Sequence, residues 1–408
     1  MEVSVEPSVI RGRVRAPYSK SLGIRTIFYS LLSKVKLSYV PTADDINAAI
    51  AAVTALGVKR EGNEFVFDSR RDEAEVYVGG SATTLRMLLP IAAALGVKLK
   101  VDGDESLRRR PIREFYSFAR KYGIELTSDR LPLTMRGKLN AKEVEISGGE
   151  SSQYISGLMF AFAIVGEGRV KVIPPVSSKS YIFMTADFLN SQGVKVKVGE
   201  GWEIDVSRGN PKPYEGEIPG DYALASFYAI AASVTGGEIE VENLYQHGDY
   251  FGDHSVVGLL REMGVESELK GNSWFVRGRP EKGIQVNLDD APDLAVSMAA
   301  IAPFSKTPTV MEGVERLRIK ESDRISSIIG TVEAFGGRAE YSGGRLIVYP
   351  SGLRRGEIEC PNDHRIAMMA SVFALVVGGT IKKAECVKKS NPNYWEDLEM
   401  LGGRVSYG

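Results

Sequence analysis

The sequence is poor in the residues that several common kinds of site require. Two of its 408 residues are cysteines and three are histidines. Cys360 and Cys386 offer no disulfide framework, which is typical of a reducing cytosol, so we expect a cytoplasmic protein. His247, His254 and His364 lack the spacing of metal ligands, and no C-x-x-C, H-E-x-x-H, Walker or G-x-G-x-x-G motif is present. We therefore expect no metal and no nucleotide cofactor.

An excess of charge of one sign is also lacking. Lysine and arginine number 51 and aspartate and glutamate 52, for a net charge of −1. Because a protein that neutralises a nucleic-acid backbone usually carries a basic excess, we expect no nucleic-acid partner. The opening "MEVSVEPSVI" has no basic segment followed by an apolar one, and the apolar run around "GLMFAFAIVG" is far shorter than a membrane span. We expect a soluble protein without a membrane partner and, at this length, two domains.

What the sequence does contain is a repeat. Six times an amphipathic helical pattern ends at a glycine and a short alternating segment follows, as in "VTALGVKREGNEFVF". The marker glycines are Gly57, Gly123, Gly193, Gly264, Gly336 and Gly402. They are spaced by 66, 70, 71, 72 and 66 residues, which indicates an architecture built from copies. Each glycine is expected just after a helix, where a left-handed backbone is favoured, with a hairpin behind it.

A second, more apolar helix precedes each marker glycine. These helices are expected to begin near Lys20, Thr83, Ser152, Asp221, Asp293 and His364. One copy therefore comprises a strand, a buried helix, a strand, an outer helix and a hairpin. The sixth copy ends at Gly408 after one strand of its hairpin, and "MEVSVEPSVI" alternates like the missing partner. This closure predicts a discontinuous domain of residues 1–17 plus 221–408 and an inserted domain of residues 18–220, each with three copies.

The buried helices open with more polar residues than capping needs. Their starts read "YSKS", "GSATT", "GESSQY", "PGDYALAS", "APDLAVS" and "PNDHR". Helix N-termini expose backbone N–H groups and the positive end of the helix dipole, so clustered starts favour anions. A single start of this kind is usually a plain cap. Six together, with Lys20, Arg25 and Arg365 beside them, favour a shared anion site.

Cations also gather in three short motifs. "LRRRPI" places three arginines, ending at Arg110, before a proline, and "KKSNPNYW" places Lys388 and Lys389 before a turn. "RLRIKESDR" mixes cations with acidic residues. Charge runs are often solvated faces with weak ion pairs, and a helix-surface pair remains an alternative for Glu321 and Arg324, which are three residues apart.

Nine motifs in fixed order together resemble one enzyme family. They are "SKSLGIR", "GSATTLR", "RRRPI", "SSQY", "SKSY", "APDLA", "KESDR", "NDHRIAM" and "KKSNPNYW", and they cover essentially the whole chain. The sequence is similar to the 5-enolpyruvylshikimate-3-phosphate (EPSP) synthases, which are enolpyruvyl transferases. The resemblance implies an α/β fold of two inside-out α/β barrels, each with three copies of a βαβαββ unit, and an active site in the interdomain cleft.

The resemblance also implies a reaction. Members transfer the enolpyruvyl (carboxyvinyl) group of phosphoenolpyruvate to the 5-hydroxyl of shikimate 3-phosphate by addition and elimination, releasing phosphate, on the route to chorismate and aromatic amino acids. No cofactor is involved, and we expect a monomer. The two substrates bring roughly five to six negative charges into one site. Seven cations match family motifs, which explains a neutral protein with a basic site. They are Lys20, Arg25, Arg110, Lys320, Arg324, Arg365 and Lys389.

Roles for single residues follow from the resemblance. Lys20 is expected to touch both substrates, Asp293 to accept the proton of the 5-hydroxyl, and Glu321, together with Lys20, to exchange a proton with C3. Contacts to shikimate 3-phosphate are expected from Lys20, Ser21, Arg25, Ser151, Ser152, Gln153, Ser178, Tyr181, Asp293 and Lys320. Contacts to phosphoenolpyruvate are expected from Lys20, Ala82, Arg110, Gln153, Arg324, Arg365 and Lys389.

Two of these expectations carry open alternatives. A carboxylate beside several cations should have a lowered pKa, which suits Asp293 as a base better than Glu321 as an acid. Arg86, at the end of "ATTLR", is either a substrate contact or a residue of helix or interdomain packing.

The sequence departs from the family pattern at two places. Tyr18 stands where the family often has glycine, and we assign it no chemical role. Ala82 occupies a position that lies against phosphoenolpyruvate in the family, where glycine admits the inhibitor glyphosate. The Ala82 methyl group is therefore predicted to make the enzyme glyphosate-tolerant.

Two other functions compete with this interpretation. The enolpyruvyl transferases that act on UDP-N-acetylglucosamine share the fold, but their first motif ends in Lys-Asn and their inserted domain carries a catalytic cysteine. Here Ser21 follows the lysine, and residues 18–220 contain no cysteine. A non-catalytic protein that binds anions or RNA ends would have no need of Asp293, and the charge balance disfavours it.

Overall fold

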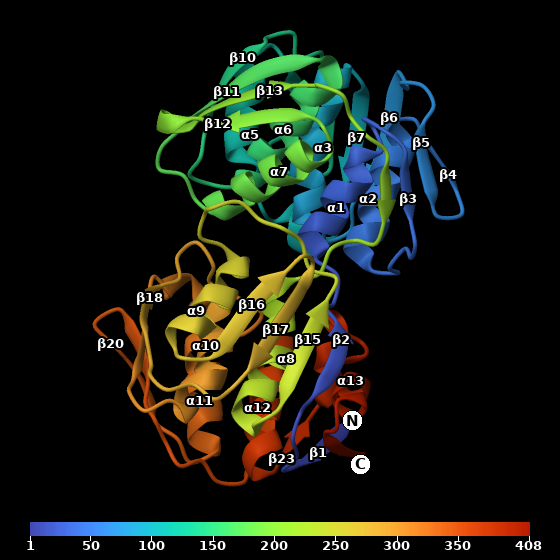
Figure 1. Ribbon diagram of the computed structural model, residues 1–408. Coiled ribbons are helices and arrows are strands. Elements are labelled where there is room, and N and C mark those ends of the chain that lie inside the picture. Colours follow the sequence, from blue (N-terminus) through green and yellow to red (C-terminus); the bar gives the residue numbers. More distant parts are fainter. The chain divides into compact units, whose positions relative to one another are not determined.

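A computed structural model describes residues 1–408 of the chain. The chain forms two compact units, drawn in Figure 1. Unit 1 comprises Met1–Tyr18, Pro219–Gln246 and Phe251–Gly408, and unit 2 comprises Ser19–Ile218 and His247–Tyr250. The predicted domains of residues 1–17 plus 221–408 and 18–220 lie within two residues of these limits, apart from His247–Tyr250.

The short segment His247–Tyr250 belongs to unit 2, although the sequence predicts it as part of unit 1. Its contacts within unit 2 explain the assignment: the Gly248 N–H donates to Asp187 Oδ2 at 2.8 Å, and the Tyr250 ring stacks on Phe183 with centroids 5.2 Å apart. Nothing in the local sequence pattern indicates this packing, because it depends on a residue some sixty positions away.

Unit 2 contains three four-stranded sheets, each with one buried and one outer helix. The sheet orders are β14-β3-β5-β4, β6-β7-β9-β8 and β10-β11-β13-β12. The strands are β3 (Val35–Leu37), β4 (Val58–Glu61), β5 (Glu64–Phe67), β6 (Glu73–Tyr77), β7 (Lys98–Asp102), β8 (Glu125–Leu126), β9 (Leu133–Arg136), β10 (Glu143–Ser147), β11 (Glu167–Ile173), β12 (Lys195–Val198), β13 (Glu203–Ser207) and β14 (Tyr214–Gly216). The helices are α1 (Lys20–Tyr29), α2 (Asp44–Leu56), α3 (Ala82–Leu95), α4 (Glu105–Arg108), α5 (Arg113–Lys121), α6 (Ser152–Val165), α7 (Lys179–Ser191) and the 3-10 turn η1 (Glu200–Trp202).

Unit 1 repeats the same plan. Its sheet orders are β16-β17-β15-β2, β18-β19-β21-β20 and β22-β23-β1-β24. The strands are β1 (Glu2–Glu6), β2 (Gly12–Arg15), β15 (Glu238–Glu242), β16 (Glu266–Lys270), β17 (Ser273–Arg277), β18 (Gln285–Asn287), β19 (Thr309–Glu312), β20 (Ala339–Ser342), β21 (Arg345–Val348), β22 (Gly356–Glu359), β23 (Gly379–Lys382) and β24 (Arg404–Tyr407). The helices are α8 (Tyr222–Thr235), η2 (Asp253–Ser255), α9 (Val256–Glu262), α10 (Leu294–Ile301), η3 (Ala302–Phe304), η4 (Glu315–Ile319), α11 (Arg324–Ala334), α12 (His364–Val377), η5 (Ala384–Lys389) and α13 (Tyr394–Met400).

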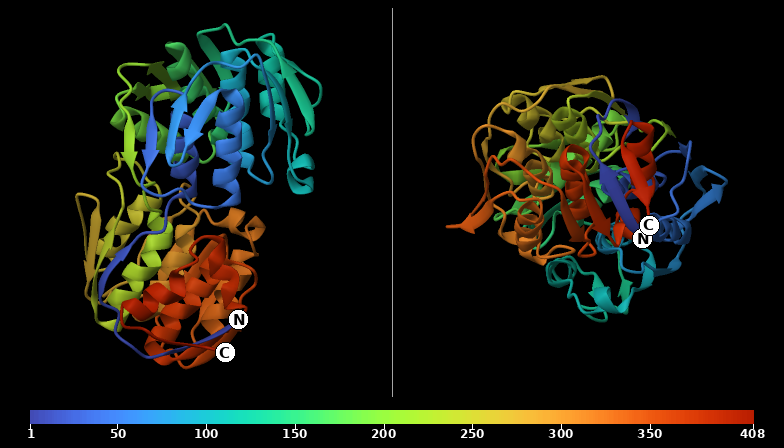
Figure 2. Two further views of the ribbon diagram at one scale, coloured as in Figure 1. Left: turned by 90° about the vertical axis from the view of Figure 1, so that its right-hand side faces the viewer. Right: turned by 90° about the horizontal axis from the view of Figure 1, so that it is seen from below.

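The predicted closure by the N-terminal strand is confirmed. Strand β1 lies between β23 and β24 and pairs antiparallel with both, so the two ends of the chain are neighbours in one sheet (Figure 2). The structure also shows that two strands exchange places between the copies, which the repeat did not reveal. Strand β2, which precedes α1 in the chain, pairs with β15 of unit 1, while β14 pairs with β3 and completes the first sheet of unit 2.

The six predicted buried helices begin within one residue of their predicted starts. Their side chains form the core of each unit, and α8 is buried along its whole length. In unit 2, α3 and α6 approach very closely at Gly157, where an added Cβ would lie 2.5 Å from Pro90 Cγ and 2.9 Å from the Met87 carbonyl oxygen. This glycine lets the starts of the two helices lie side by side.

The marker glycines also behave as predicted. All six have positive φ, from 74° at Gly123 to 121° at Gly57, and each lies one or two residues after the last residue of an outer helix. A left-handed residue ends a helix and reverses the chain, and glycine adopts it without steric cost.

The cysteines depart from expectation. Cys360 and Cys386 form a disulfide in unit 1, although the sequence offers no disulfide framework. Cys360 precedes α12 and Cys386 lies in η5, so the two sulfur atoms meet through packing of elements that are 26 residues apart. A pair of cysteines with no wider pattern does not predict such a contact.

Reduction of this disulfide should lower the thermal stability of unit 1. A cross-link across 26 residues restricts the unfolded chain by roughly 3–4 kcal/mol, so the Tm of the wild type should fall by several degrees in reductant. Thermal unfolding followed by circular dichroism, with and without dithiothreitol, measures the shift. The double variant Cys360→Ser/Cys386→Ser is the control and should not respond to reductant. Equal responses of both proteins would contradict the prediction.

Candidate active site

In unit 2 the starts of α3 and α6 bring polar side chains together. Gln153 donates from Nε2 to Thr83 Oγ1 at 2.7 Å and accepts from Arg86 Nη1 at 3.0 Å. Ser151 caps α6 by accepting from the Gln153 backbone N–H at 3.1 Å. We call Thr83, Arg86, Arg110, Ser151 and Gln153 the Gln153 cluster. It contains hydroxyls, an amide and two guanidinium groups, which together suit an anionic, hydroxylated ligand.

The structure separates the three arginines of "LRRRPI". Arg108 pairs with Asp102 at 2.6 Å and Arg109 with Glu105 at 2.8 Å, both on the surface. Arg110 makes no ion pair, and burial together with the nearby Arg86 lowers its pKa. Two guanidinium groups held close together, opposed only in part by the charge of Glu150, favour binding of an anion.

The start of α1 carries the other predicted residues of unit 2. Ser19 caps the helix by accepting from the Leu22 N–H at 3.2 Å, which leaves Lys20 and Ser21 in the first turn. Lys20 is largely exposed, with its Nζ 3.4 Å from Asp45. Such a surface pair is weak, so the lysine is available to a ligand.

Arg25 is buried and connects three helices. It donates to Thr185 Oγ1 of α7 at 2.8 Å, to Ser156 Oγ of α6 at 3.1 Å and to the Ser21 carbonyl of α1 at 3.0 Å. Its guanidinium also lies 5.9 Å from the centre of the Tyr181 ring. Arg25 therefore positions α1, α6 and α7 as well as contributing charge.

Ser178 and Tyr181 lie at the start of α7. Ser178 occupies the cap position with φ of 51°, in the left-handed region that serine rarely adopts. Backbone strain of this kind is concentrated at functional sites in proteins. Ser152, next to the Ser151 cap, is buried in the first turn of α6.

In unit 1 one arginine holds three carboxylates. Arg324, which is 1% exposed, donates to Asp293 Oδ1 at 2.7 Å, to Glu321 Oε2 at 2.6 Å and to Asp363 Oδ2 at 2.9 Å. Arg365 adds a second cation, with Nη2 3.5 Å from Asp293 Oδ2. We call these five residues the Arg324 cluster. The ion pair of Glu321 with Arg324, which the sequence left open as a helix-surface alternative, is present, but its arginine is buried and Glu321 lies before the helix.

Asp293 is held as a carboxylate by its neighbours. Burial alone would raise its pKa, but Arg365, Arg324 and Lys320 outweigh burial and lower the pKa well below the usual range. Arg365 is 6% exposed, and its Nη1 is buried without a hydrogen-bond partner. An unpaired guanidinium nitrogen in the interior is costly unless a ligand satisfies it.

Glu321 faces cations and an imidazole. His364 Nε2 and Lys389 Nζ each lie 3.9 Å from Glu321 Oε1. His364 and then Arg324 lower the pKa of Glu321 well below its usual range, although burial opposes them. Glu321 is thus ionised at neutral pH, as expected for a carboxylate in such a cluster.

The comparisons with known proteins agree with this chemistry. A profile of EPSP synthase (3-phosphoshikimate 1-carboxyvinyltransferase) matches residues 5–398. A protein named 3-phosphoshikimate 1-carboxyvinyltransferase from Sulfurisphaera tokodaii is 49% identical over 407 residues, or 99% of each chain. The chain belongs to the EPSP synthase family. A protein of the same name from Saccharolobus solfataricus is 46% identical over 415 positions and covers both chains completely.

Solved structures of EPSP synthases also match the fold. Two structures of the Acinetobacter baumannii EPSP synthase superpose with a TM-score of 0.82 over 100% of both chains, at 24% and 22% identity. The expected α/β fold is thereby confirmed.

Several residues of this EPSP synthase family member were not singled out from the sequence. Asp363 is fully buried, caps α12 and accepts from Arg324, and His364 contacts Glu321. Both belong to the "NDHR" motif, of which only Arg365 is predicted as a site residue. Asp253, in η2, is a further carboxyl group beside Asp293, and burial raises its pKa. The sequence shows Asp363 only as a helix cap, because its contact with Arg324 depends on the tertiary structure.

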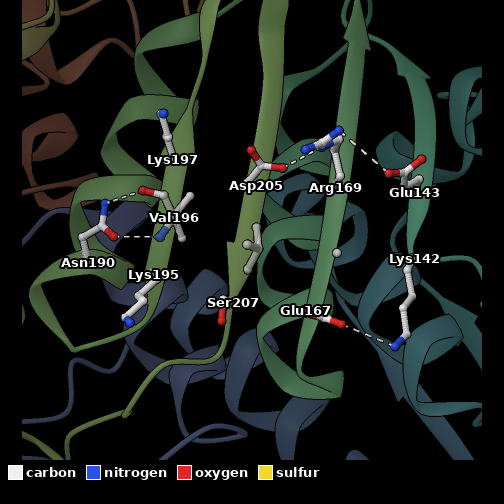
Figure 3. A pocket seen from close by; sticks show the side chains of 12 residues that line it. Lys142, Glu143, Glu167, Arg169, Asn190, Lys195, Val196, Lys197, Asp205 and Ser207 are labelled. Atoms are coloured by element: carbon white, nitrogen blue, oxygen red, sulfur yellow. Dashed lines mark hydrogen bonds and ion pairs between the residues drawn. The ribbon is translucent and has the colours of Figure 1, made fainter.

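A shallow cavity of about 540 Å³ lies elsewhere in unit 2, on sheet β10-β11-β13-β12 (Figure 3). Its charges pair across strands: Arg169 with Asp205 at 2.7 Å and Lys142 with Glu167 at 3.6 Å. None of the predicted site residues lines it, so it is an outer sheet face, on which Lys195 and Lys197 are further cations, rather than the site. No three His, Cys, Asp or Glu side chains are grouped as metal ligands. The chain also has no helix with the length and apolarity that crossing a membrane requires.

Proposed function

We propose that this chain transfers the enolpyruvyl group of phosphoenolpyruvate to the 5-hydroxyl of shikimate 3-phosphate and releases phosphate, the activity of the family. The observation that carries the proposal is the Arg324 cluster. It combines an ionised carboxylate, Asp293, with a buried guanidinium nitrogen of Arg365 that lacks a partner. A base and an unsatisfied anion contact in one place are what the reaction requires.

The proposed steps conserve every atom. Asp293 accepts the proton of the 5-hydroxyl while the hydroxyl oxygen bonds to C2 of phosphoenolpyruvate. C3 takes up a proton, which gives a tetrahedral intermediate. The C2–O bond to phosphate then breaks, C3 loses a proton, and the enolpyruvyl ether remains. Arg365 and Arg324 stabilise the negative charge that stays on the carboxylate and phosphate throughout.

We propose that both clusters serve this one reaction. The phosphoenolpyruvate contacts are assigned to Lys20, Ala82, Arg110, Gln153, Arg324, Arg365 and Lys389. The shikimate 3-phosphate contacts are assigned to Lys20, Ser21, Arg25, Ser151, Ser152, Gln153, Ser178, Tyr181, Asp293 and Lys320. The unpaired state of Arg110 supports the first set. The hydroxyl groups at the starts of α1, α6 and α7 support the second set.

The proton exchange at C3 is assigned to Lys20 in the addition step and to Glu321 in the elimination step. Because the pKa of Glu321 is lowered, this carboxylate is ionised before the reaction and is better suited to remove the C3 proton in the elimination step. Lys20, whose ammonium group is exposed, supplies the proton in the addition step. A monomer in the cytoplasm is part of the same proposal.

Phosphate release tests the function. The purified protein with phosphoenolpyruvate and shikimate 3-phosphate should release phosphate and form the enolpyruvyl ether, and omission of either substrate should abolish both. Replacing shikimate 3-phosphate by UDP-N-acetylglucosamine separates the two enolpyruvyl transferases. Turnover with the sugar nucleotide alone, or binding without turnover of either acceptor, would overturn the proposal.

Ala82 should determine tolerance to glyphosate. It is the first residue of α3, behind the Ser81 cap, and its side chain is partly exposed. One methyl group in a binding pocket changes affinity by roughly 10- to 200-fold, so Ala82→Gly should lower the inhibitory concentration of glyphosate at least tenfold. Steady-state inhibition against phosphoenolpyruvate measures this change. Ala141→Gly, in the loop before β10, is the control, and equal inhibition of wild type and Ala82→Gly would contradict the prediction.

A further inference from the structure

Two segments of unit 1 meet beside Glu321. His364 is the first residue of α12, and Ser390 directly follows η5. The Nδ1 atom of His364 and the Ser390 hydroxyl form a hydrogen bond, while the Nε2 atom faces Glu321 Oε1 at 3.9 Å. His364 is 5% exposed, so its two ring nitrogens have these groups as their neighbours rather than bulk water.

The ring can present its proton to one neighbour at a time. Burial lowers the pKa of His364, and Arg365 adds to this effect, while Glu321 and Asp363 oppose it. The imidazole is therefore neutral at pH 7, with one N–H and one lone pair. Glu321 is ionised and can only accept, so a lone pair on Nε2 would repel it.

The serine resolves this choice. The Ser390 hydroxyl can donate to Nδ1 only when the ring proton is on Nε2, on the side of the Glu321 carboxylate, so this donation stabilises the Nε2–H form. Without the hydroxyl, the Nε2–H form loses this hydrogen bond and is favoured by the Glu321 carboxylate alone, so a larger fraction of the molecules turns a lone pair toward Glu321. We propose that Ser390 is a positioning residue that holds His364 in the Nε2–H tautomer and thereby supports Glu321 in the proton exchange at C3.

A second cationic neighbour of Glu321 lies next to this contact in the chain. Lys389 precedes Ser390, and its Nζ lies 3.9 Å from the same Glu321 oxygen. The segment is anchored on both sides of the serine: by the Cys360–Cys386 disulfide, and by Asn391 Nδ2, which donates to the Tyr228 hydroxyl at 2.6 Å. Loss of one hydroxyl between these anchors should leave the fold intact.

The inference rests on the proposed function for its kinetic consequence, but the tautomer can be observed independently. The chain has three histidines, so ¹⁵N-labelled imidazole spectra are simple, and His364→Asn identifies the signal of His364. In the wild type the Nε2–H form should dominate at pH 7. In Ser390→Ala the Nδ1–H form should become populated, and Ser390→Thr, which restores a hydroxyl, should return the ring to Nε2–H.

Kinetics provide the second measurement. Ser390→Ala should lower kcat about tenfold, the size of one lost hydrogen bond, with the KM for phosphoenolpyruvate within about twofold. Ser390→Thr should recover most of kcat, and unchanged thermal unfolding of both variants would show that they are folded.

The outcomes separate the two proposals. An unchanged tautomer in Ser390→Ala, or equal impairment of the alanine and threonine variants, would overturn the role of Ser390. A raised KM with normal kcat would also overturn the role of Ser390, because the serine would then act on substrate binding through Lys389. Absence of wild-type turnover with a tautomer that responds to Ser390 would overturn the proposed function alone.

Discussion

Asp293→Asn should lower kcat by roughly 10³- to 10⁴-fold, the contribution of a well-placed general base. The amide has nearly the same shape but cannot accept the proton of the 5-hydroxyl. In the wild type Arg324 and Arg365 both contact this carboxylate, at 2.7 and 3.5 Å, and they keep it ionised. Phosphate release at saturating concentrations of both substrates measures the loss.

The control for this variant is Asp289→Asn. Asp289 lies four residues before Asp293 and is mostly exposed, with a surface contact to Arg316. It should retain kcat within about twofold, since surface pairs contribute little. If Asp293→Asn retained more than a tenth of wild-type activity, Asp293 would not be the base.

The lowered pKa of Asp293 also has a consequence for stability. A carboxyl group whose pKa is lower in the folded than in the unfolded state stabilises the fold above its unfolded value of about 4. That contribution disappears as the pH falls through the folded value. Both Asp293 and Glu321 are of this kind. The free energy of unfolding of unit 1 should therefore fall below about pH 4 and stay unchanged near neutral pH.

Arg365→Gln should raise the KM for phosphoenolpyruvate by roughly 100-fold or more. Its Nη1 is buried without a partner, so a bound anion would satisfy it fully, and a charge-assisted contact in such a setting contributes about 2–5 kcal/mol. Glutamine keeps some hydrogen-bonding capacity but removes the charge. Calorimetric titration with phosphoenolpyruvate, alongside steady-state KM, separates binding from turnover.

Two further variants sharpen this result. Arg365→Lys keeps the charge but loses the planar fork and should fall between the wild type and Arg365→Gln. Arg109→Gln removes an exposed arginine whose partner is Glu105, and it should bind as the wild type does. Phosphoenolpyruvate binding that is unaffected in Arg365→Gln would exclude Arg365 from the substrate contacts.

Much of the architecture was predictable because its signals are local. A glycine just after a helix adopts a positive φ in every copy, so Gly57 and Gly402 indicate the same turn in different copies. The starts of the buried helices were predictable for a similar reason, since Ser151 and Asp221 cap the helix that follows within the next three residues.

The sequence predicted which residues belong to the candidate site better than it predicted the contacts among them. The motifs singled out Asp293, Arg324 and Arg365, and the structure brings these three together. It also brings Asp363 and His364 to them, which the sequence left looking like an ordinary helix start. Of three consecutive arginines, Arg110 is the one without an ion pair, because Asp102 and Glu105 happen to face the other two.

By itself, then, the sequence determined the repeat, its six helix starts, the closing strand and the family. The tertiary structure alone decided the exchange of β2 and β14, the disulfide between Cys360 and Cys386, and the hydrogen bond between Ser390 and His364. The physical reason is distance along the chain. Caps, turns and periodicity arise from neighbours in sequence, whereas partners that lie tens or hundreds of residues apart meet only when the cores have packed.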